Sequence, residues 1–140
     1  MDALSYWIAV VALTVGAGLG IVGFFFPKTA ARIVRLQADP DPKLPGGFAE
    51  FRASYGGLFL GGHAAALAVT IPAARGSAWA ENFALGACAV LAAAWAMTAV
   101  GRVLSGFLDR TRTGYNVGSA IFEAVLAVMI AAPIRAALAG

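Results

Sequence analysis

Residues 4–26 form an apolar stretch that contains no charged side chain and ends at Pro27. An apolar segment of about 20 residues is long enough to cross the hydrocarbon core of a bilayer as a helix. A secretory signal peptide has a shorter apolar region of about 7–15 residues behind a basic start, and no basic residue precedes this stretch. The stretch therefore predicts a retained transmembrane helix, with Tyr6 and Trp7 at one membrane interface.

Three further apolar segments predict spans at about residues 48–74, 82–108 and 115–137. The chain is 61% hydrophobic and 12% charged, whereas a soluble domain is about half apolar and about a quarter charged. No separate soluble domain is indicated. We expect an all-α fold in which residues 1–140 form a single transmembrane domain, an integral membrane four-helix bundle with short loops.

The segment after the first span has a different pattern. Lys28, Arg32 and Arg35 lie at i, i+4 and i+7, with apolar residues between them. This spacing predicts a short amphipathic helix over residues 28–38 that lies on the membrane surface. The Asp-Pro-Asp-Pro sequence at residues 39–42 ends any helix, because proline lacks a backbone donor and restricts the residue before it.

The basic residues predict the orientation of the chain. Eight of the ten Lys and Arg residues fall in or beside the first and third loops. The positive-inside rule places these loops in the cytoplasm and both termini outside it. The eight are Lys28, Arg32, Arg35, Lys43, Arg52, Arg102, Arg110 and Arg112, and the other two are Arg75 and Arg135.

Glycines gather in the second span. Gly57 and Gly61 have the small-xxx-small spacing that lets two membrane helices approach closely. The third span is rich in alanine, which also suits close packing. We expect the glycines of this span to let another helix approach closely, and they make self-association into a homo-oligomer plausible; they are Gly56, Gly57, Gly61 and Gly62.

Five ionisable residues fall inside the predicted spans, namely Glu50, Arg52, His63, Arg102 and Glu123. Each costs roughly 2.5–3.5 kcal/mol at membrane depth and is by default a functional-site hypothesis. Counted from the third loop, Arg102 and Glu123 both lie roughly 10–12 Å inside the membrane. We therefore predict that these two side chains interact, directly or through water.

Polar residues at helical spacing extend this pair into two stripes, one on the third span and one on the fourth. Polar residues at the start of the second span come from the same membrane side. We expect them to line a polar chamber whose arginines bind an anionic headgroup or carboxylate. The candidate ligand-binding residues are Glu50, Arg52, Tyr55, Arg102, Ser105, Asp109, Asn116, Ser119 and Glu123.

Other sites find little support. His63 lies deeper and is more typical of a hydrogen-bonded packing residue than of a ligand, and it cannot supply two axial haem ligands. Cys88 is typical of a small buried hydrophobe. Asp39 and Asp41 are a weak metal signal. No Walker loop, GxSxG or HExxH motif occurs, and no basic run with interleaved aromatic residues indicates nucleic acid. We expect no cofactor and no metal.

Residues 50–57 read EFRASYGG, residues 102–109 read RVLSGFLD, and Glu123 follows in the fourth span. With Gly61, these segments resemble a bacterial membrane family, domain of unknown function 4345. That family has an E-x-R-A-x-Y-G-G segment opening its second helix, an R-x-x-S-x-x-x-D segment closing its third and a glutamate in its fourth. In that family glycine and proline often follow the aspartate. This chain departs from the pattern, because Arg110, Thr111 and Arg112 follow Asp109. The resemblance implies a four-helix fold with a shared polar cluster and implies no activity. We expect the protein in a bacterial inner (plasma) membrane.

Three functional hypotheses remain open. The first is binding of a lipid or other anionic amphipathic molecule by Arg52, Arg102, Tyr55 and Glu123. The second is a structural or oligomeric protein whose charges only fix the helix register. The third is a proton-coupled carrier or a membrane enzyme, with Glu123 or Glu50 as proton acceptor. Membrane lipids are the expected partners in each case.

Overall fold

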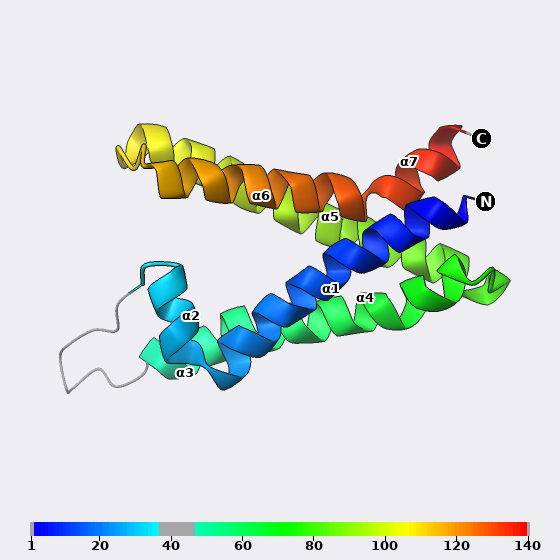
Figure 1. Ribbon diagram of the computed structural model, residues 1–140, viewed down its shortest axis with the longest axis horizontal. Helices are drawn as coiled ribbons and strands as arrows, with labels where there is room; N and C mark the ends of the chain where they lie inside the picture. The colour runs from blue at the N-terminus through cyan, green and yellow to red at the C-terminus, as the bar shows by residue number, and fades with distance from the viewer. Residues whose placement is uncertain (1, 37–46, 140) are drawn as a thin grey trace. The chain divides into compact units, whose positions relative to one another are not determined.

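The computed structural model describes residues 2–36 and 47–139, and every regular element in these ranges is a helix. The all-α prediction is confirmed, and the predicted proline-containing loop at residues 39–42 lies outside the described residues. The chain divides into two compact units, one of residues 1–12 with 66–140 and one of residues 13–65. Figure 1 labels the helices, and each unit is described by itself.

The helices in chain order are α1 (Ala3–Phe25), α2 (Pro27–Ile33), α3 (Gly47–Phe51), the π-helix η1 (Arg52–Leu58), α4 (Phe59–Ala74), α5 (Ala78–Leu108), α6 (Gly114–Ile130) and α7 (Ala132–Ala139).

Within residues 2–36 and 47–139, three helical segments are long and apolar enough to cross a membrane: α1 with 23 residues, Gly47–Ala74 with 28 and α5 with 31. At 1.5 Å per residue even α1 is about 35 Å long, which exceeds a hydrocarbon core of about 30 Å. The positions of the membrane boundaries, and hence the predicted span limits, stay predictions.

The fourth predicted span is broken in the structure. Helices α6 and α7 meet at a bend of 44°, and they qualify as a membrane span only as a pair. Pro133 lies at the start of α7 and is buried. Its ring lacks the N–H that would continue the hydrogen-bond ladder of α6. The span predicted at about residues 115–137 therefore corresponds to two helices that meet at this bend.

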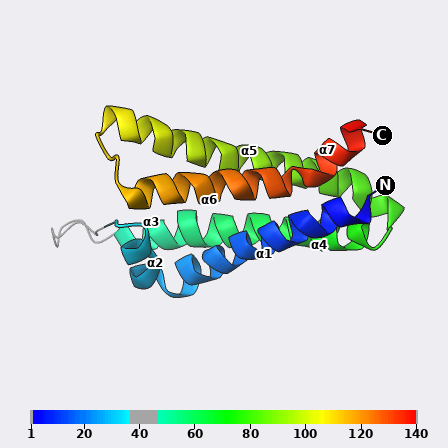
Figure 2. The ribbon, with the colours of Figure 1, turned by 45° about the horizontal axis from the view of Figure 1, so that its top comes forward.

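In the unit of residues 1–12 and 66–140, α5 buries a face of small residues. Helices α5 and α6 lie side by side in both ribbon views (Figures 1 and 2). Tyr6, predicted at the membrane interface, is only 2% exposed and packs with Ala73, Ala74, Ala80 and Ala84. Its ring is therefore shielded by protein. The buried residues of α5 are Ala80, Ala84, Cys88, Ala92, Trp95, Ala99 and Gly106.

In the unit of residues 13–65, the helices approach closely at glycines of α1 and η1. A Cβ on Gly56 would lie 2.6 Å from the backbone nitrogen and Cα of Phe24, and one on Gly23 would lie 3.1 Å from Gly56. No described atom lies within 4 Å of a Cβ built on Gly61, and Gly57 would meet only ordinary contacts. Of the glycines expected to let another helix approach, Gly56 therefore meets α1, whereas Gly57 and Gly61 make no such close approach within the described residues.

The short helix predicted after the first span is present as α2. It begins with Pro27, whose missing N–H is harmless in the first turn. It ends at Ile33, and Arg35, two residues later, takes a left-handed φ of 60°. The N–H of Leu36 donates to Ala31 O and that of Arg35 to Arg32 O, which is a Schellman ending. The helix is thus shorter than predicted, and its place on the membrane surface stays a prediction.

Candidate functional site

Arg102 on α5 and Glu123 on α6 form a salt bridge, as predicted from their matched depths. The Arg102 Nε donates to Glu123 Oε1 at 2.5 Å. The arginine side chain is 27% exposed and the glutamate side chain 6%. A charge-assisted hydrogen bond of this kind is among the stronger ones in proteins, so the pair ties the two antiparallel helices together at one level.

Asn116 and the α5–α6 connection hold this end of the helix pair in place. Asn116 Nδ2 donates to Arg102 O at 3.0 Å, and its backbone N–H donates to Thr113 Oγ1 at 3.2 Å, so that Thr113 caps α6. Ser105 Oγ and Thr111 Oγ1 lie 3.0 Å apart. The polar residues predicted on α5 and α6 thus meet partly through the connection between the helices.

Arg112 in the same connection reaches back to α5. Its Nε donates to Gly106 O at 3.2 Å, and its guanidinium carbon lies 4.6 Å from the centre of the Phe107 ring. That distance is within the range of a cation–π interaction. The sequence placed Arg112 at this membrane interface but did not select it as a site residue. The sequence feature that could have pointed to Arg112 is its position in residues 110–112, where the chain departs from the family pattern.

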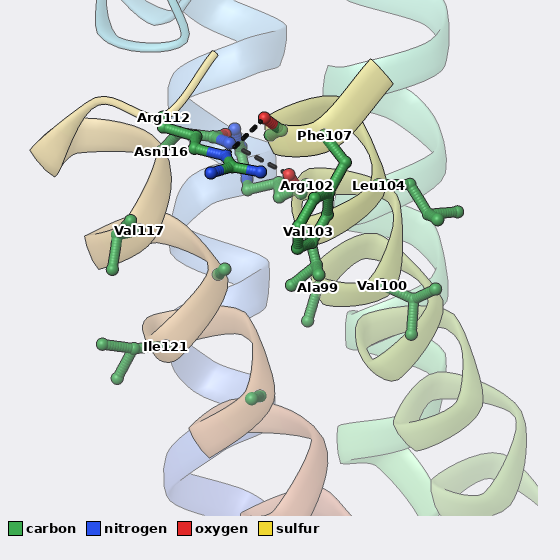
Figure 3. Close-up of a pocket in the computed structure, with 13 residues that line it drawn as sticks. Ala99, Val100, Arg102, Val103, Leu104, Phe107, Arg112, Asn116, Val117 and Ile121 are labelled. Atoms are coloured by element: carbon green, nitrogen blue, oxygen red, sulfur yellow. Dashed lines mark hydrogen bonds between the residues drawn. The ribbon is translucent and has the colours of Figure 1, made fainter. Parts of the chain in front are cut away.

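An apolar groove of about 680 Å³ runs along α5 and α6 beside these residues. Figure 3 shows Arg102, Arg112 and Asn116 toward one end of it, with Val117, Ile121 and Ala99 farther along. The sequence analysis did not select the apolar lining, because such residues look like ordinary lipid-facing positions. The lining residues are Ala99, Val100, Arg102, Val103, Leu104, Gly106, Phe107, Arg112, Asn116, Val117, Ala120, Ile121 and Ala124.

Glu123 lies apart from the groove, since it is not among the described lining residues. Its Oε2 is buried and has no hydrogen-bond partner within the described part of the chain. Most buried polar atoms in proteins are hydrogen-bonded, so an exception calls for an explanation such as a water, an ion, a proton or a catalytic role. Glu123 Oε2 could therefore still accept a hydrogen bond from another group.

The residues predicted at the start of the second span occupy η1 and the helix before it. Arg52 Nη1 donates to Phe24 O at 2.5 Å. This carbonyl lies in the last turn of α1, where intrahelical partners are missing. Glu50 Oε1 accepts from Ser54 Oγ at 2.8 Å, and the Tyr55 ring stacks on Phe51 with centroids 4.7 Å apart. Arg52 thus caps the end of α1.

The π-helix itself was not predicted. It covers Arg52–Leu58, most of the segment that carries the family resemblance. Such widened turns are rare and often occur at functional sites. Whether Glu50, Arg52 and Tyr55 share a chamber with the Arg102–Glu123 pair stays a prediction, since they belong to the other unit of the chain.

The side chains of two predicted site residues form no hydrogen bond with the rest of the site within the described residues. Asp109 is exposed and ends α5 with a backbone hydrogen bond to Ser105 O. Ser119 is half-buried on α6, and no side-chain hydrogen bond links it to the described residues. Their roles as ligand-binding residues stay predictions.

His63 and Cys88 are buried residues whose side chains pack against their neighbours. His63 is 2% exposed, its Nδ1 lies 2.7 Å from Phe59 O, and its ring fills the space beside Gly16. Cys88 is buried with its sulfur 3.8 Å from Thr70 Oγ1. Within the residues that the structure describes, no group of three or more His, Cys, Asp or Glu residues could hold a metal ion.

A comparison with protein families matches residues 4–132 to the family described as Domain of unknown function (DUF4345). The chain belongs to this family. The membership predicted from the motifs in residues 50–57 and 102–109 is confirmed, and the family description states no activity. Searches of curated proteins and of solved structures found no match.

Proposed function

We propose that this protein binds an anionic amphipathic molecule in the groove along α5 and α6. The apolar chain would lie along Val117 and Ile121, and the anionic group would meet Arg102 and Arg112. The observation that carries the proposal is the composition of the groove, which is apolar along its length and has two arginines, Arg102 and Arg112, toward one end. Guanidinium groups bind carboxylates and phosphates through paired hydrogen bonds.

The length of the groove limits which molecules could bind in it. Its lining runs from Ala99 to Phe107 on α5 and from Asn116 to Ala124 on α6. Each stretch is roughly 12 Å long at 1.5 Å per residue, less than half of a hydrocarbon core of about 30 Å. An occupant would therefore come from one leaflet, which suits a lipid, a fatty acid or another single-headed amphiphile.

Native mass spectrometry of the detergent-extracted protein tests this proposal, because it reports bound small molecules and subunit number together. We expect an anionic amphiphile bound to the wild-type protein. Ala120→Trp should remove it by filling the groove, and Arg112→Gln should weaken its binding by removing a cation.

Two matched variants control for general damage. Val125→Trp places the same ring at an exposed position of α6 outside the groove, and Arg75→Gln removes an exposed arginine elsewhere. Both should retain the amphiphile. Wild-type protein without any anionic amphiphile, or an Ala120→Trp variant that keeps it, would show that the groove is not a binding site.

A structural role is the second candidate, and the links between α5 and α6 favour it. The Arg102–Glu123 salt bridge and the Asn116 bond to Arg102 O both fix the register of the two helices. Interhelical hydrogen bonds in membranes contribute on average about 0.6 kcal/mol each. If Arg102→Gln lowers thermal stability while the bound amphiphile is unchanged, the charges serve the fold alone.

A further inference from the structure

Both arginines of the groove use their Nε for a contact within the protein. Arg102 Nε donates to Glu123 Oε1, and Arg112 Nε donates to Gly106 O. The Nη groups of the two side chains make no hydrogen bond to the described residues, and both arginines line the groove. A guanidinium has five N–H donors, so the Nη donors of each arginine remain available to a ligand.

The charges that hold these donors do not cancel. Arg102 and Arg112 are positive, and Glu123, which pairs with Arg102 and has a 6% exposed side chain, is negative. This three-residue cluster of Arg102, Arg112 and Glu123 therefore has one positive charge in excess. Asp109 and Arg110 in the neighbouring connection are exposed, do not line the groove and carry opposite charges.

The other described charged residues of this unit lie toward the opposite ends of α5 and α6, and none of them lines the groove. Glu81, for example, is roughly 30 Å along α5 from Arg102 at 1.5 Å per residue. The charge next to the groove is therefore set by the three-residue cluster. The distant residues are Asp2, Arg75, Glu81 and Arg135.

A ligand with one negative charge would balance the three-residue cluster. A headgroup with two negative charges would leave one of them uncompensated, and an uncompensated charge is costly at membrane depth. Glu123 would lie near the excess charge, because it would share Arg102 with the ligand. Like charges that are brought close together weaken binding.

We propose that the groove selects a headgroup with a single negative charge, and that Glu123 sets this preference through Arg102. This inference rests on the proposed function. It narrows the ligand to an amphiphile with a carboxylate or a phosphodiester, whose oxygens accept from the Nη donors. A phosphate monoester carries a charge of about −1.5 to −2 near neutral pH and is disfavoured. Glu123 determines specificity without binding the ligand itself.

Three probes with alkyl chains of similar length test this preference on the full chain in nanodiscs of zwitterionic lipid. They are decanoate, methyl decyl phosphate and decyl phosphate, and the two phosphates differ by one methyl group. At about pH 8.5, well above the second pKa of a phosphate monoester of about 6, decyl phosphate carries two charges and the other probes carry one. Isothermal titration calorimetry measures each affinity, after subtraction of the partitioning into nanodiscs without protein.

The wild-type protein should bind methyl decyl phosphate about tenfold more tightly than decyl phosphate, because one unit charge at close range in a partly buried site has an effect of at least this size. Decanoate should also bind more tightly than decyl phosphate. The tighter of the two singly charged probes then identifies the headgroup as a carboxylate or a phosphodiester.

Glu123→Gln removes the negative charge and keeps the length of the side chain. The preference should then shift about tenfold toward decyl phosphate, because the two arginines would balance two charges. Glu123→Asp keeps the charge and should keep the preference. Glu81→Gln is the matched control, because it removes a carboxylate from the far end of α5, and it should also keep the preference. The ratio of the two phosphate affinities is the readout, since a merely structural role of Glu123 would weaken both probes alike.

The possible failures are distinguishable. If wild-type protein binds the two phosphates equally or prefers decyl phosphate, or if Glu123→Gln keeps the wild-type ratio, the charge selection is wrong while the binding site stands. If wild-type protein binds none of the three probes, or if Ala120→Trp leaves their binding unchanged, the proposed function fails and the charge selection fails with it. The wild-type ratio decides the question even if Glu123→Gln does not fold.

Discussion

Breaking the Arg102–Glu123 pair from its two sides should have unequal effects on stability. The Glu123 side chain is 6% exposed. Arg102→Met leaves its carboxylate without its one described partner. An uncompensated buried charge of this kind costs about 3–5 kcal/mol. Glu123→Leu leaves Arg102, whose side chain is 27% exposed and lines the groove. A long arginine can move its charged end toward a polar boundary, so this variant should lose only about 1 kcal/mol.

The double variant Arg102→Met/Glu123→Leu removes both charges at once. Replacing a buried ion pair by apolar residues of similar volume is often neutral or stabilising, so we expect a stability within about 1 kcal/mol of the wild type. The loss in the double variant should then fall about 3 kcal/mol or more below the sum of the two single losses. A coupling of that size is at the upper end of the range for residues in direct contact.

Equilibrium unfolding in mixed micelles, titrated with SDS and followed by circular dichroism, measures these free energies. The four proteins form a double-mutant cycle in which the wild type is the reference. Two results would refute the reasoning. Equal losses in the two single variants would show that burial does not set the asymmetry, and additive losses would show that the charges do not interact.

Three further predictions concern other contacts and use the same unfolding assay. Gly56→Ala should lower the free energy of unfolding by about 1–3 kcal/mol, because the new methyl group meets the Phe24 backbone. Gly61→Ala should be neutral or slightly stabilising. Equal effects of the two variants would disprove the contact between Gly56 and Phe24. Arg52→Leu should lose about 1 kcal/mol by freeing the Phe24 carbonyl, and an unchanged stability would show that this cap is unimportant. Thr113→Ala should lose about 1 kcal/mol by removing the α6 cap, and Thr113→Ser, which keeps the hydroxyl, should be close to wild type.

The sequence was sufficient for contacts that depend on position along a helix. The match between Arg102 and Glu123 followed from counting residues on both sides of one short loop, because each residue of a helix advances by a fixed rise. His63 was expected as a hydrogen-bonded packing residue, and its bond to Phe59 O fits that expectation.

Contacts that depend on how a helix is rotated were harder to predict. Four glycines of the second span were expected to let another helix approach, and the spacing of Gly57 and Gly61 singled out that pair, but Gly56 is the one that meets α1. The π-helix over Arg52–Leu58 changes the rotation of each following residue, so a count based on 3.6 residues per turn does not say which of these glycines meets another helix. The motif in residues 50–57 drew attention to this segment without indicating its backbone geometry.

The sequence by itself determined that this chain is helical and apolar enough to enter a membrane, since long uncharged segments allow few other structures in lipid. It also determined which ionic side chains lie deep in the predicted spans, because depth follows from distance to the nearest loop. The tertiary structure alone decided that Arg102 faces both Glu123 and an apolar groove, and that Arg112 folds back onto α5. The physical reason is that a groove is made by the packing of two helices, which the sequence of either helix does not specify.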